Sequence, residues 1–164
     1  MTYTDNDYPN FTALLRQRPH ARARIVGSKS YPDIRGIVRF YQTAYGVVVV
    51  AEVKGLPNPA GYCSAPIFGF HIHEGTECTG NETDPFANVK THYNPHACPH
   101  PYHAGDLPPL FGADGRALSI FLSNRFTVRE ILGRTVVIHS SPDDFSSQPA
   151  GNSGAKRACS ESVQ

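Results

Sequence analysis

Histidine is the residue type in this chain that most clearly suggests chemistry. The chain has eight histidines in 164 residues, and seven of them lie between positions 71 and 139. Imidazole nitrogens are common ligands for zinc and copper. Histidines gathered this closely therefore indicate a metal site.

Two of these histidines belong to a predicted strand. His71 and His73 lie in the segment FGFHIHEG. Side chains two residues apart in a strand point to the same face, so both imidazoles emerge together while Phe70 and Ile72 face the core. An H-x-H pair alone is weak evidence, because two surface histidines give the same pattern. His139 ends the segment RTVVIH and offers a nitrogen from a second strand.

A long polar segment, residues 75–115, supplies the other candidate ligands. They are His92, His96, His100, His103 and Asp106. A single loop histidine is usually solvated, but four within twelve residues, followed by a carboxylate that can complete a zinc tetrahedron, favour metal binding. A loop this long inside a compact domain usually has a function.

Short strands must position these residues. Runs rich in β-branched and aromatic residues, bounded by Gly, Pro, Ser or Asp, are ARARIVGS, GIVRFYQT, GVVVVAEVKG, FGFHIHEG, ALSIFLSN and RTVVIHS. Such a series predicts an all-β sandwich or barrel. The segment SSPDDFSSQPAGNSG is predicted to be a second irregular loop.

The first 20 residues are predicted to be an N-terminal extension to a β domain spanning residues 21–164. One short amphipathic helix is expected over Phe11–Arg18, with Asn10 as its cap. A chain of this length fits one domain with one core.

The charge is nearly balanced overall but unevenly distributed. The net charge is +1, and residues 1–54 hold eight Lys and Arg against four Asp and Glu. We interpret this excess as a solvated basic face rather than a site for an anionic partner. No apolar run approaches the length that spans a bilayer. We therefore expect neither a nucleic-acid partner nor a membrane partner.

The cysteines and the N-terminus point to different compartments. The four cysteines are Cys63, Cys78, Cys98 and Cys159, and their wide spacing favours disulfides over a thiolate zinc site. Disulfides favour an oxidising compartment. The N-terminal sequence MTYTDNDYPNF shows no export signal. A cytoplasmic location is expected unless the chain is a trimmed form of a secreted protein.

The order and spacing of these motifs resemble the copper/zinc superoxide dismutase family, as a bacterial-type member with an N-terminal extension. The matching motifs are GFHIHE, HYNP, HAGDLP, GRTVVIH, the DD pair and GNSGAKRAC, within residues 21–160. The resemblance implies a Greek-key β-barrel with two long functional loops. Residues 1–19 and the segment around 57–66 have no counterpart in the family.

The resemblance also implies roles for individual residues. His71, His73 and His139 match copper ligands, and His92 matches the histidine that bridges copper and zinc. The remaining zinc ligands correspond to His100, His103 and Asp106. Asp143 matches a carboxylate behind the ligands that links the two metal sites, and Cys78 and Cys159 match the family disulfide. His96 has no counterpart and is expected to be solvated.

Three departures from the family pattern affect these expectations. Lys156 stands where the family has an arginine beside the copper, with Arg157 next to it; lysine keeps the charge but loses the planar fork. Cys63 and Cys98 lie outside the family disulfide and could pair with each other. The chain ends in CSESVQ rather than an apolar tail, which puts the family's common dimer contact in doubt while leaving a homodimer open.

The resemblance implies dismutation of superoxide to oxygen and hydrogen peroxide, by a redox-cycling copper linked through His92 to a structural zinc. His92 is expected to handle protons and Lys156 to steer the anion. The main alternative is a copper/zinc-binding protein of the same fold without turnover. A cupin-like barrel is disfavoured, because Ala65 and Asp84 stand where its motif has glycines. An interaction module with incidental histidines is also disfavoured.

Overall fold

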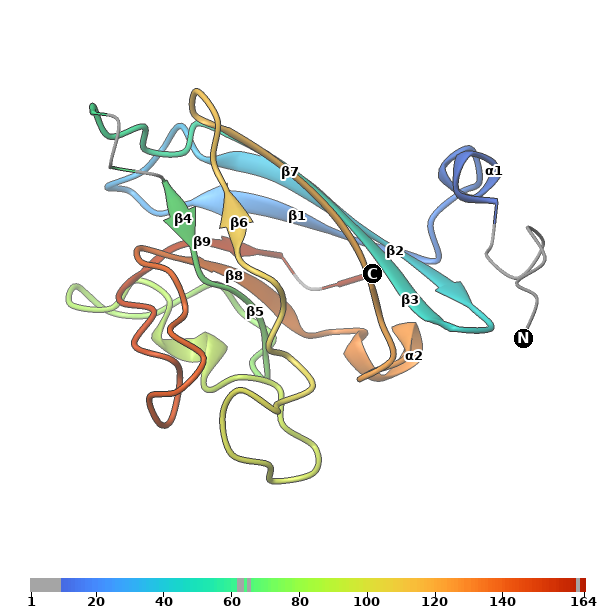
Figure 1. Cartoon of the computed structure of the whole chain (residues 1–164). Coiled ribbons are helices and arrows are strands. Elements are labelled where there is room, and N and C mark those ends of the chain that lie inside the picture. Colours follow the sequence, from blue (N-terminus) through green and yellow to red (C-terminus); the bar gives the residue numbers. More distant parts are fainter. Residues whose placement is uncertain (1–9, 62–63, 65, 162) are drawn as a thin grey trace.

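The computed structural model describes residues 10–61, 64, 66–161 and 163–164, and its main feature is one curled antiparallel sheet (Figure 1). Four of its strands, β1 (Ala21–Gly27), β2 (Arg35–Thr43), β3 (Gly46–Lys54) and β7 (Arg116–Ser123), lie next to one another. Their sequences are predicted strand runs rich in β-branched residues. The all-β expectation is confirmed.

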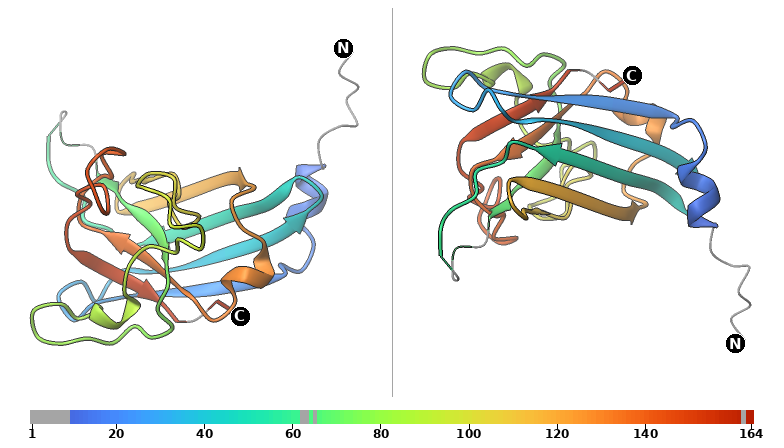
Figure 2. Two further views of the ribbon diagram at one scale, coloured as in Figure 1. Left: turned by 90° about the horizontal axis from the view of Figure 1, so that it is seen from below. Right: turned by 90° about the horizontal axis from the view of Figure 1, so that it is seen from above.

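The remaining strands join the sheet out of their order in the sequence. β5 (Phe70–His73), β8 (Thr135–His139) and β9 (Lys156–Ser160) complete the order β5-β8-β9-β1-β2-β3-β7. β4 (Ile67–Phe68) and β6 (Leu110–Phe111) pair separately. Because β4 leads into β5 and β6 leads into β7, this short pair connects the two edge strands of the curled sheet (Figure 2).

Inward and outward side chains alternate along the long strands, as the pleat of a β-strand requires. In β1, Ala23 and Ile25 are buried while Arg22 and Arg24 are exposed. The inward side chains of the sheet form one apolar core, with Phe40 among its fully buried members. This core is the rigid support on which the candidate ligands stand.

β5 and β8 are buried on both faces, which sets them apart from the outer strands. Phe70 and Ile72 of β5 belong to the apolar core, as predicted. The opposite face of these strands lies under two long loops, residues 74–109 and 140–155 (Figure 1). His71 and His73 are buried on that second face, so the loops exclude solvent from them.

The predicted N-terminal helix is present but shorter than expected. α1 spans Phe11–Leu15, and the Asn10 side chain accepts a hydrogen bond from the Ala13 N–H at 3.1 Å. Asn10 is therefore the cap that its residue type predicted. Pro19 disfavours a helical conformation at Arg18, which accounts for the early end. The division into an extension (1–20) and a β domain (21–164) stays a prediction.

α1 covers part of the outer side of the sheet. Leu14 is buried against Tyr41 of β2 and against Val48 and Val50 of β3. Seen from above, the helix lies across one end of the sheet (Figure 2). The extension therefore covers apolar residues that would otherwise face water.

Besides α1, four regular elements in the described part of the chain lie outside the predicted strand runs. They are β6, β9, the short helix η1 (Ala87–Val89) and α2 (Val128–Ile131), which begins with a capping box between Thr127 and Glu130. β9 has the sequence KRACS, and its two basic residues give it no strand-like pattern of apolar residues. It forms a strand because it pairs with β8 and β1. No helix in the described part of the chain is long and apolar enough to cross a membrane.

Candidate metal centre

Two groups of buried ligand residues lie under the loops and share His92. The first group is His71, His73, His92 and His139, whose ligand atoms all lie within 4.8 Å of one another. Strands β5 and β8 pair antiparallel and hold three of these histidines in fixed positions. His92 joins them through a bridge between its backbone and that of His73.

The second group contains His92, His100, His103 and Asp106, also within 4.8 Å of one another. The Nδ1 atom of His92 lies 2.7 Å from Asp106 Oδ1, and the Nδ1 atoms of His100 and His103 lie 3.1 and 3.3 Å from Asp106 Oδ2. Three nitrogens and a carboxylate are a donor set typical of tetrahedral zinc.

Several buried ring nitrogens of these groups have no hydrogen-bond partner. They are His71 Nδ1, His92 Nε2, His100 Nδ1 and His103 Nδ1. A buried polar atom without a hydrogen bond costs about 1–3 kcal/mol. His100 Nδ1 and His103 Nδ1 lie near Asp106 Oδ2 without forming a hydrogen bond to it, so all four atoms favour a compensating ligand. A metal cation in each of the two ligand groups satisfies them. The residues present therefore fit two metal ions.

The other nitrogen of each first-group strand histidine is held by an acceptor, which fixes its tautomer. His71 Nε2–H donates to Asp143 Oδ2 at 2.7 Å. His73 Nδ1–H donates to the Lys90 carbonyl at 2.9 Å, and His139 Nδ1–H donates to the Gly154 carbonyl at 3.2 Å. Each ring thus presents its free nitrogen to the metal volume, an arrangement that orients ligands before a metal arrives.

Asp143 connects the two groups from behind. Besides His71, it accepts a hydrogen bond from His100 Nε2–H at 2.9 Å, and its side chain is fully buried. Burial opposes its ionisation, but the bonds from His71, the Phe145 N–H and His100 outweigh this and hold the pKa of the Asp143 carboxyl below its usual range. Asp143 is therefore an anion placed between a member of each group.

Burial keeps the three strand histidines His71, His73 and His139 neutral. It lowers the pKa of His71 from 6.5 to about 4, although the hydrogen bond to Asp143 acts in the opposite direction. Burial also lowers the pKa of His139 to about 3, and it places the pKa of His73 well below 6.5. Neutral imidazole is the form that binds metal, so the ligands are ready at neutral pH.

In the metal-free protein, these histidines should make the free energy of unfolding fall as the pH drops. Because their folded-state pKa values lie below 6.5, the unfolded state binds more protons below that pH. Stability should be fully present above about pH 6.5 and decline towards pH 4, with His71 alone contributing on the order of 3 kcal/mol. Urea unfolding of chelator-treated protein at a series of pH values measures this decline.

The control for that measurement is the metal-loaded protein. Its ligand nitrogens are occupied, so its stability should begin to fall at a lower pH than that of the metal-free form. A metal-free stability that stays level or rises between pH 6.5 and pH 4 would contradict the burial of neutral histidines.

Two side chains outside every sequence motif hold the zinc-type loop in place. The Gln148 side chain accepts from the His100 N–H at 3.0 Å and donates to the His100 carbonyl at 2.7 Å. Arg125 donates to the carbonyl of Pro101 at 2.9 Å and to that of His103 at 3.4 Å. Neither residue belongs to a motif from which the sequence predicts a ligand, so only the folded chain reveals these contacts.

Lys156 lies beside the first group and is paired with an acid. It stands opposite His139 in the ladder between β8 and β9, and its Nζ forms an ion pair with Asp84 from the long loop. Burial opposes ionisation of Asp84, but the hydrogen bonds from Lys156 and the Phe86 N–H prevail and lower the pKa of this carboxyl. The neighbouring Arg157 points elsewhere and stacks over Tyr31, 4.6 Å from the ring centre.

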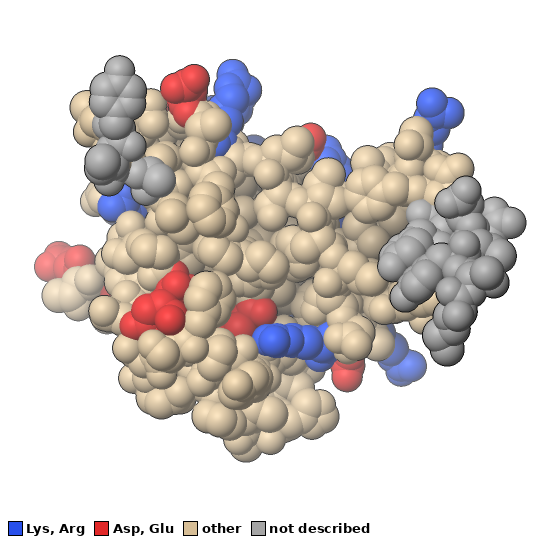
Figure 3. All heavy atoms as spheres, in the orientation of Figure 1, with Lys and Arg blue, Asp and Glu red and all other residues tan. Residues whose placement is uncertain are grey.

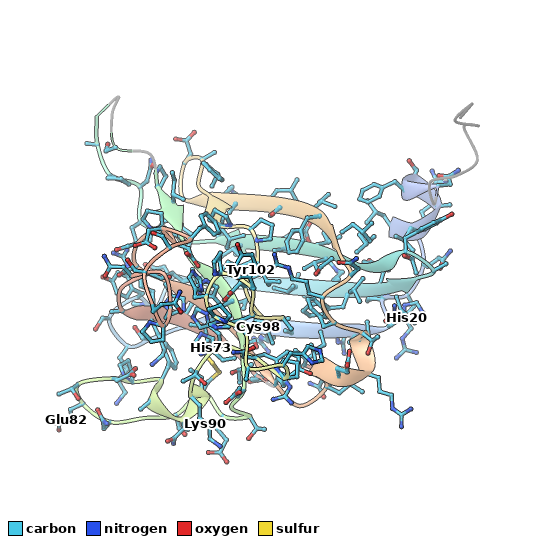
Figure 4. The ribbon with its side chains drawn as sticks, turned by 60° about the horizontal axis from the view of Figure 1, so that its bottom comes forward. His20, His73, Glu82, Lys90, Cys98 and Tyr102 are labelled. Carbon is cyan, nitrogen blue, oxygen red and sulfur yellow. A yellow bond between two sulfur atoms is a disulfide. The ribbon has the colours of Figure 1, made fainter. Side chains whose placement is uncertain are left out.

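The remaining candidates from the sequence are the cysteines and the two histidines outside the ligand groups. Cys78 and Cys159 form a disulfide that joins the long loop to β9. His96 is exposed and belongs to neither ligand group, and His20 lies at the far end of the sheet from His73 (Figure 4). Cys98 is half-buried, and its pairing with Cys63 falls outside the described residues because Cys63 is not among them.

The chain matches known proteins over most of its length. The family model described as copper/zinc superoxide dismutase (SODC) matches residues 34–161. "Superoxide dismutase (Cu-Zn) 2" of Aquifex aeolicus is 31% identical over 163 residues, covering 90% of this chain and 89% of that protein. "Superoxide dismutase (Cu-Zn)" of Deinococcus radiodurans is 34% identical over 160 residues, covering 87% and 83%.

Two solved structures have a similar fold. The crystal structure of a SOD-like protein from Bacillus subtilis superposes with a TM-score of 0.68 at 26% identity, covering 85% of this chain and 95% of that one. A double mutant of a SOD-like protein from the same organism superposes with a TM-score of 0.67 at 28% identity, covering 85% and 94%. Given the family match over residues 34–161 and two ligand groups joined at His92, the chain belongs to the copper/zinc superoxide dismutase family.

Proposed function

We propose that this chain dismutates superoxide to oxygen and hydrogen peroxide with a copper and a zinc held side by side. Copper is assigned to His71, His73, His92 and His139, and zinc to His92, His100, His103 and Asp106. The single observation that carries this assignment is the pair of ligand groups that share His92. The shared residue offers Nδ1 on the side of Asp106 and a buried, unpartnered Nε2 on the side of the first group.

The bound copper supplies the one-electron chemistry of both half-reactions, and the chain supplies the surroundings. His92 Nε2 is the atom at which a proton would be held and delivered, because its other nitrogen stays in the second group. Asp143 keeps His71 and His100 in the tautomers that leave their Nδ1 atoms free. The loops keep all these side chains out of bulk water.

Lys156 is proposed to attract the superoxide anion, and Asp84 to weaken that attraction. A cation beside the copper group raises the encounter rate with an anion, and the effect fades as salt screens it. Asp84 stands against this cation and cancels part of its field. The lysine side chain keeps 17% of its surface exposed, so an approaching anion can still reach it.

Lys156→Ala should lower the second-order rate with superoxide by about two- to tenfold at low salt and flatten its salt dependence. Asp84→Asn should do the reverse, raising the low-salt rate and steepening its decline with salt, because it frees the Lys156 charge. Pulse radiolysis over a range of ionic strength measures both rates.

Lys156→Arg is the matched control, since it keeps the positive charge and should keep most of the rate. Equal rates in Lys156→Ala and the parent protein, at every salt concentration, would remove Lys156 from the mechanism. A lower rate in Asp84→Asn would show that Asp84 supports the site rather than weakening its attraction for anions.

The test of the proposed function combines metal content with turnover. Purified protein loaded with both metals should contain one copper and one zinc per chain and should suppress superoxide-driven dye reduction. His71→Ala should lose copper and activity, while His96→Ala, at an exposed histidine, should keep both. A fully loaded protein with no such suppression would support a metal-binding protein without turnover.

Two expectations about partners complete the proposal. We expect no nucleic-acid partner, because the net charge is only +1. A homodimer remains a prediction, and sedimentation velocity of the metal-loaded chain tests it. Neither expectation affects the assignment of the metal ligands.

A further inference from the structure

The outward side chains of β1, β2, β3 and β7 form a surface that we call the outer face, on the side opposite the metal loops (Figure 2). Its basic residues are Arg22, Arg24, Arg35, Arg39, Lys54 and Arg116. The single acid on these four strands is Glu52, and it is paired with Arg39 at 2.5 Å. Figure 3 shows Lys and Arg side chains along the upper edge of the molecule, with Asp or Glu side chains among them.

Some of these cations face one another directly across the strands. Arg35 pairs with Lys54 in the ladder between β2 and β3, and Lys54 pairs with Arg116 in the ladder between β3 and β7. Like charges in such positions destabilise a sheet. Among the described residues, none of these three side chains has an acidic partner within ion-pair distance. Asp33 and Asp114 line a hollow with these three cations but form no ion pair with them, so they compensate the repulsion only in part. An anionic surface laid against this row would relieve the rest.

Apolar side chains lie next to the cations on the same face. Along β7, Leu118, Ile120 and Leu122 point outward and are 67%, 40% and 50% exposed. Leu118 stands beside Glu52 and follows Arg116 on the same face of β7. A shallow groove of about 960 Å³ is lined by Leu118, by several of the basic residues and by Phe111, which is 65% exposed. Exposed apolar rows of this kind mark binding surfaces.

We propose that the outer face binds the surface of an anionic lipid bilayer, with the cations at the headgroups and the β7 side chains in the interfacial layer. A nucleic acid or an anionic polysaccharide would satisfy the cations but leave Leu118, Ile120 and Leu122 in water. A second copy of the chain would cover the leucines but bring like charges together. A bilayer interface offers anionic groups and apolar depth side by side, which matches both the cations and the apolar row.

This proposal revises two expectations drawn from the sequence. From the sequence, the excess of basic residues in 1–54 predicts a solvated face, and the lack of a spanning segment predicts no membrane partner. The sheet register places those basic residues beside an apolar row that lies far along the chain, in β7. Binding of this kind needs no spanning segment, and it does not depend on the proposed dismutase activity.

Co-sedimentation of the metal-loaded chain with vesicles tests the proposal. The protein should bind vesicles of phosphatidylcholine mixed with phosphatidylglycerol and should not bind vesicles of phosphatidylcholine alone. Because the attraction is partly electrostatic, binding should weaken as salt increases. Arg24→Gln/Arg35→Gln should lower the partition coefficient about 25-fold, since each of the two surface cations contributes about fivefold near an anionic bilayer.

The matched control removes two cations from elsewhere on the protein. Lys90 lies at the edge of the loops on the metal side (Figure 4), and Arg129 lies in α2. Lys90→Gln/Arg129→Gln should bind the mixed vesicles as the parent protein does. A loss equal to that of the Arg24/Arg35 variant would show that net charge alone, not the outer face, controls binding, and would overturn the proposal.

The apolar row is tested separately with Leu118→Ser/Leu122→Ser. This variant should lose most of its vesicle binding, while its affinity for soluble inorganic polyphosphate should be no lower than that of the parent protein. Unchanged vesicle binding would overturn the proposal in favour of a soluble polyanion. A parent protein that sediments as a dimer, and that becomes monomeric in this variant, would assign the face to a second copy.

Discussion

Asp143→Asn should lower the affinity of the protein for both metals by about 10- to 100-fold. The carboxylate accepts one hydrogen bond from His71 and another from His100, which we assign to copper and to zinc. An amide of the same shape has a single acceptor oxygen, so one of the two imidazoles would face an N–H group and turn or change tautomer. Losing the negative charge also weakens the attraction for two cations.

Competition with a chelator, read out separately for copper and zinc, measures this loss. Asp144→Asn is the matched control, because the neighbouring carboxylate accepts only from Ser146 and Ser147 and is exposed. Near-parent affinities in Asp143→Asn would mean that the strands and loops orient His71 and His100 without help. An equal loss in Asp144→Asn would assign the effect to folding of the loop 140–155.

Removing the disulfide should have the largest effect on stability. Cys78 and Cys159 are 81 residues apart, and a cross-link closing a loop of that size stabilises the folded state by about 4 kcal/mol through the entropy of the unfolded chain. Cys78→Ala/Cys159→Ala should lower the free energy of unfolding by that amount in urea titrations. The long loop should also hold its ligands less firmly, because the cross-link joins it to β9.

Cys98→Ala provides the comparison. The Cys98 thiol is half-buried, and within the described part of the chain its contact is a long one, 4.0 Å, to the carbonyl oxygen of His96. Its removal should change the free energy of unfolding by a small fraction of the loss in the double variant. Equal losses in the two proteins, or no loss in the double variant, would contradict the role given to the Cys78–Cys159 disulfide.

The strand-borne part of the site could be predicted from the sequence because it depends on a local rule. Two histidines at i and i+2 in an extended segment must point to the same face of the strand. The apolar residues that alternate with them, at i−1 and i+1, must point to the opposite face. His71 and His73 obey this rule, and Phe70 and Ile72 lie in the core. The long strands were equally predictable, since β-branched and aromatic residues recur along whole segments.

The ligands on the long loop could not be identified by a local rule of this kind. Histidines in residues 75–115 were visible as candidates, but nothing local separates His100, which is buried, from His96, which is exposed. Spacing cannot make that distinction, because a loop has no fixed period. Only the resemblance to the dismutase family sorted them in advance, and the folded loop places His100 with Asp106 and leaves His96 in solvent.

By itself the sequence predicted the long strands β1, β2, β3 and β7, the metal-type donor set and the basic excess in residues 1–54, all of which follow from residue type and short-range spacing. Only the tertiary structure decided that Asp143 bonds a member of each ligand group, that Asp84 pairs with Lys156, and that basic residues of β1 to β3 lie beside an apolar row of β7. Each of these contacts joins residues more than 40 positions apart. Such contacts depend on how the sheet curls and where the loops return, and no local pattern encodes them.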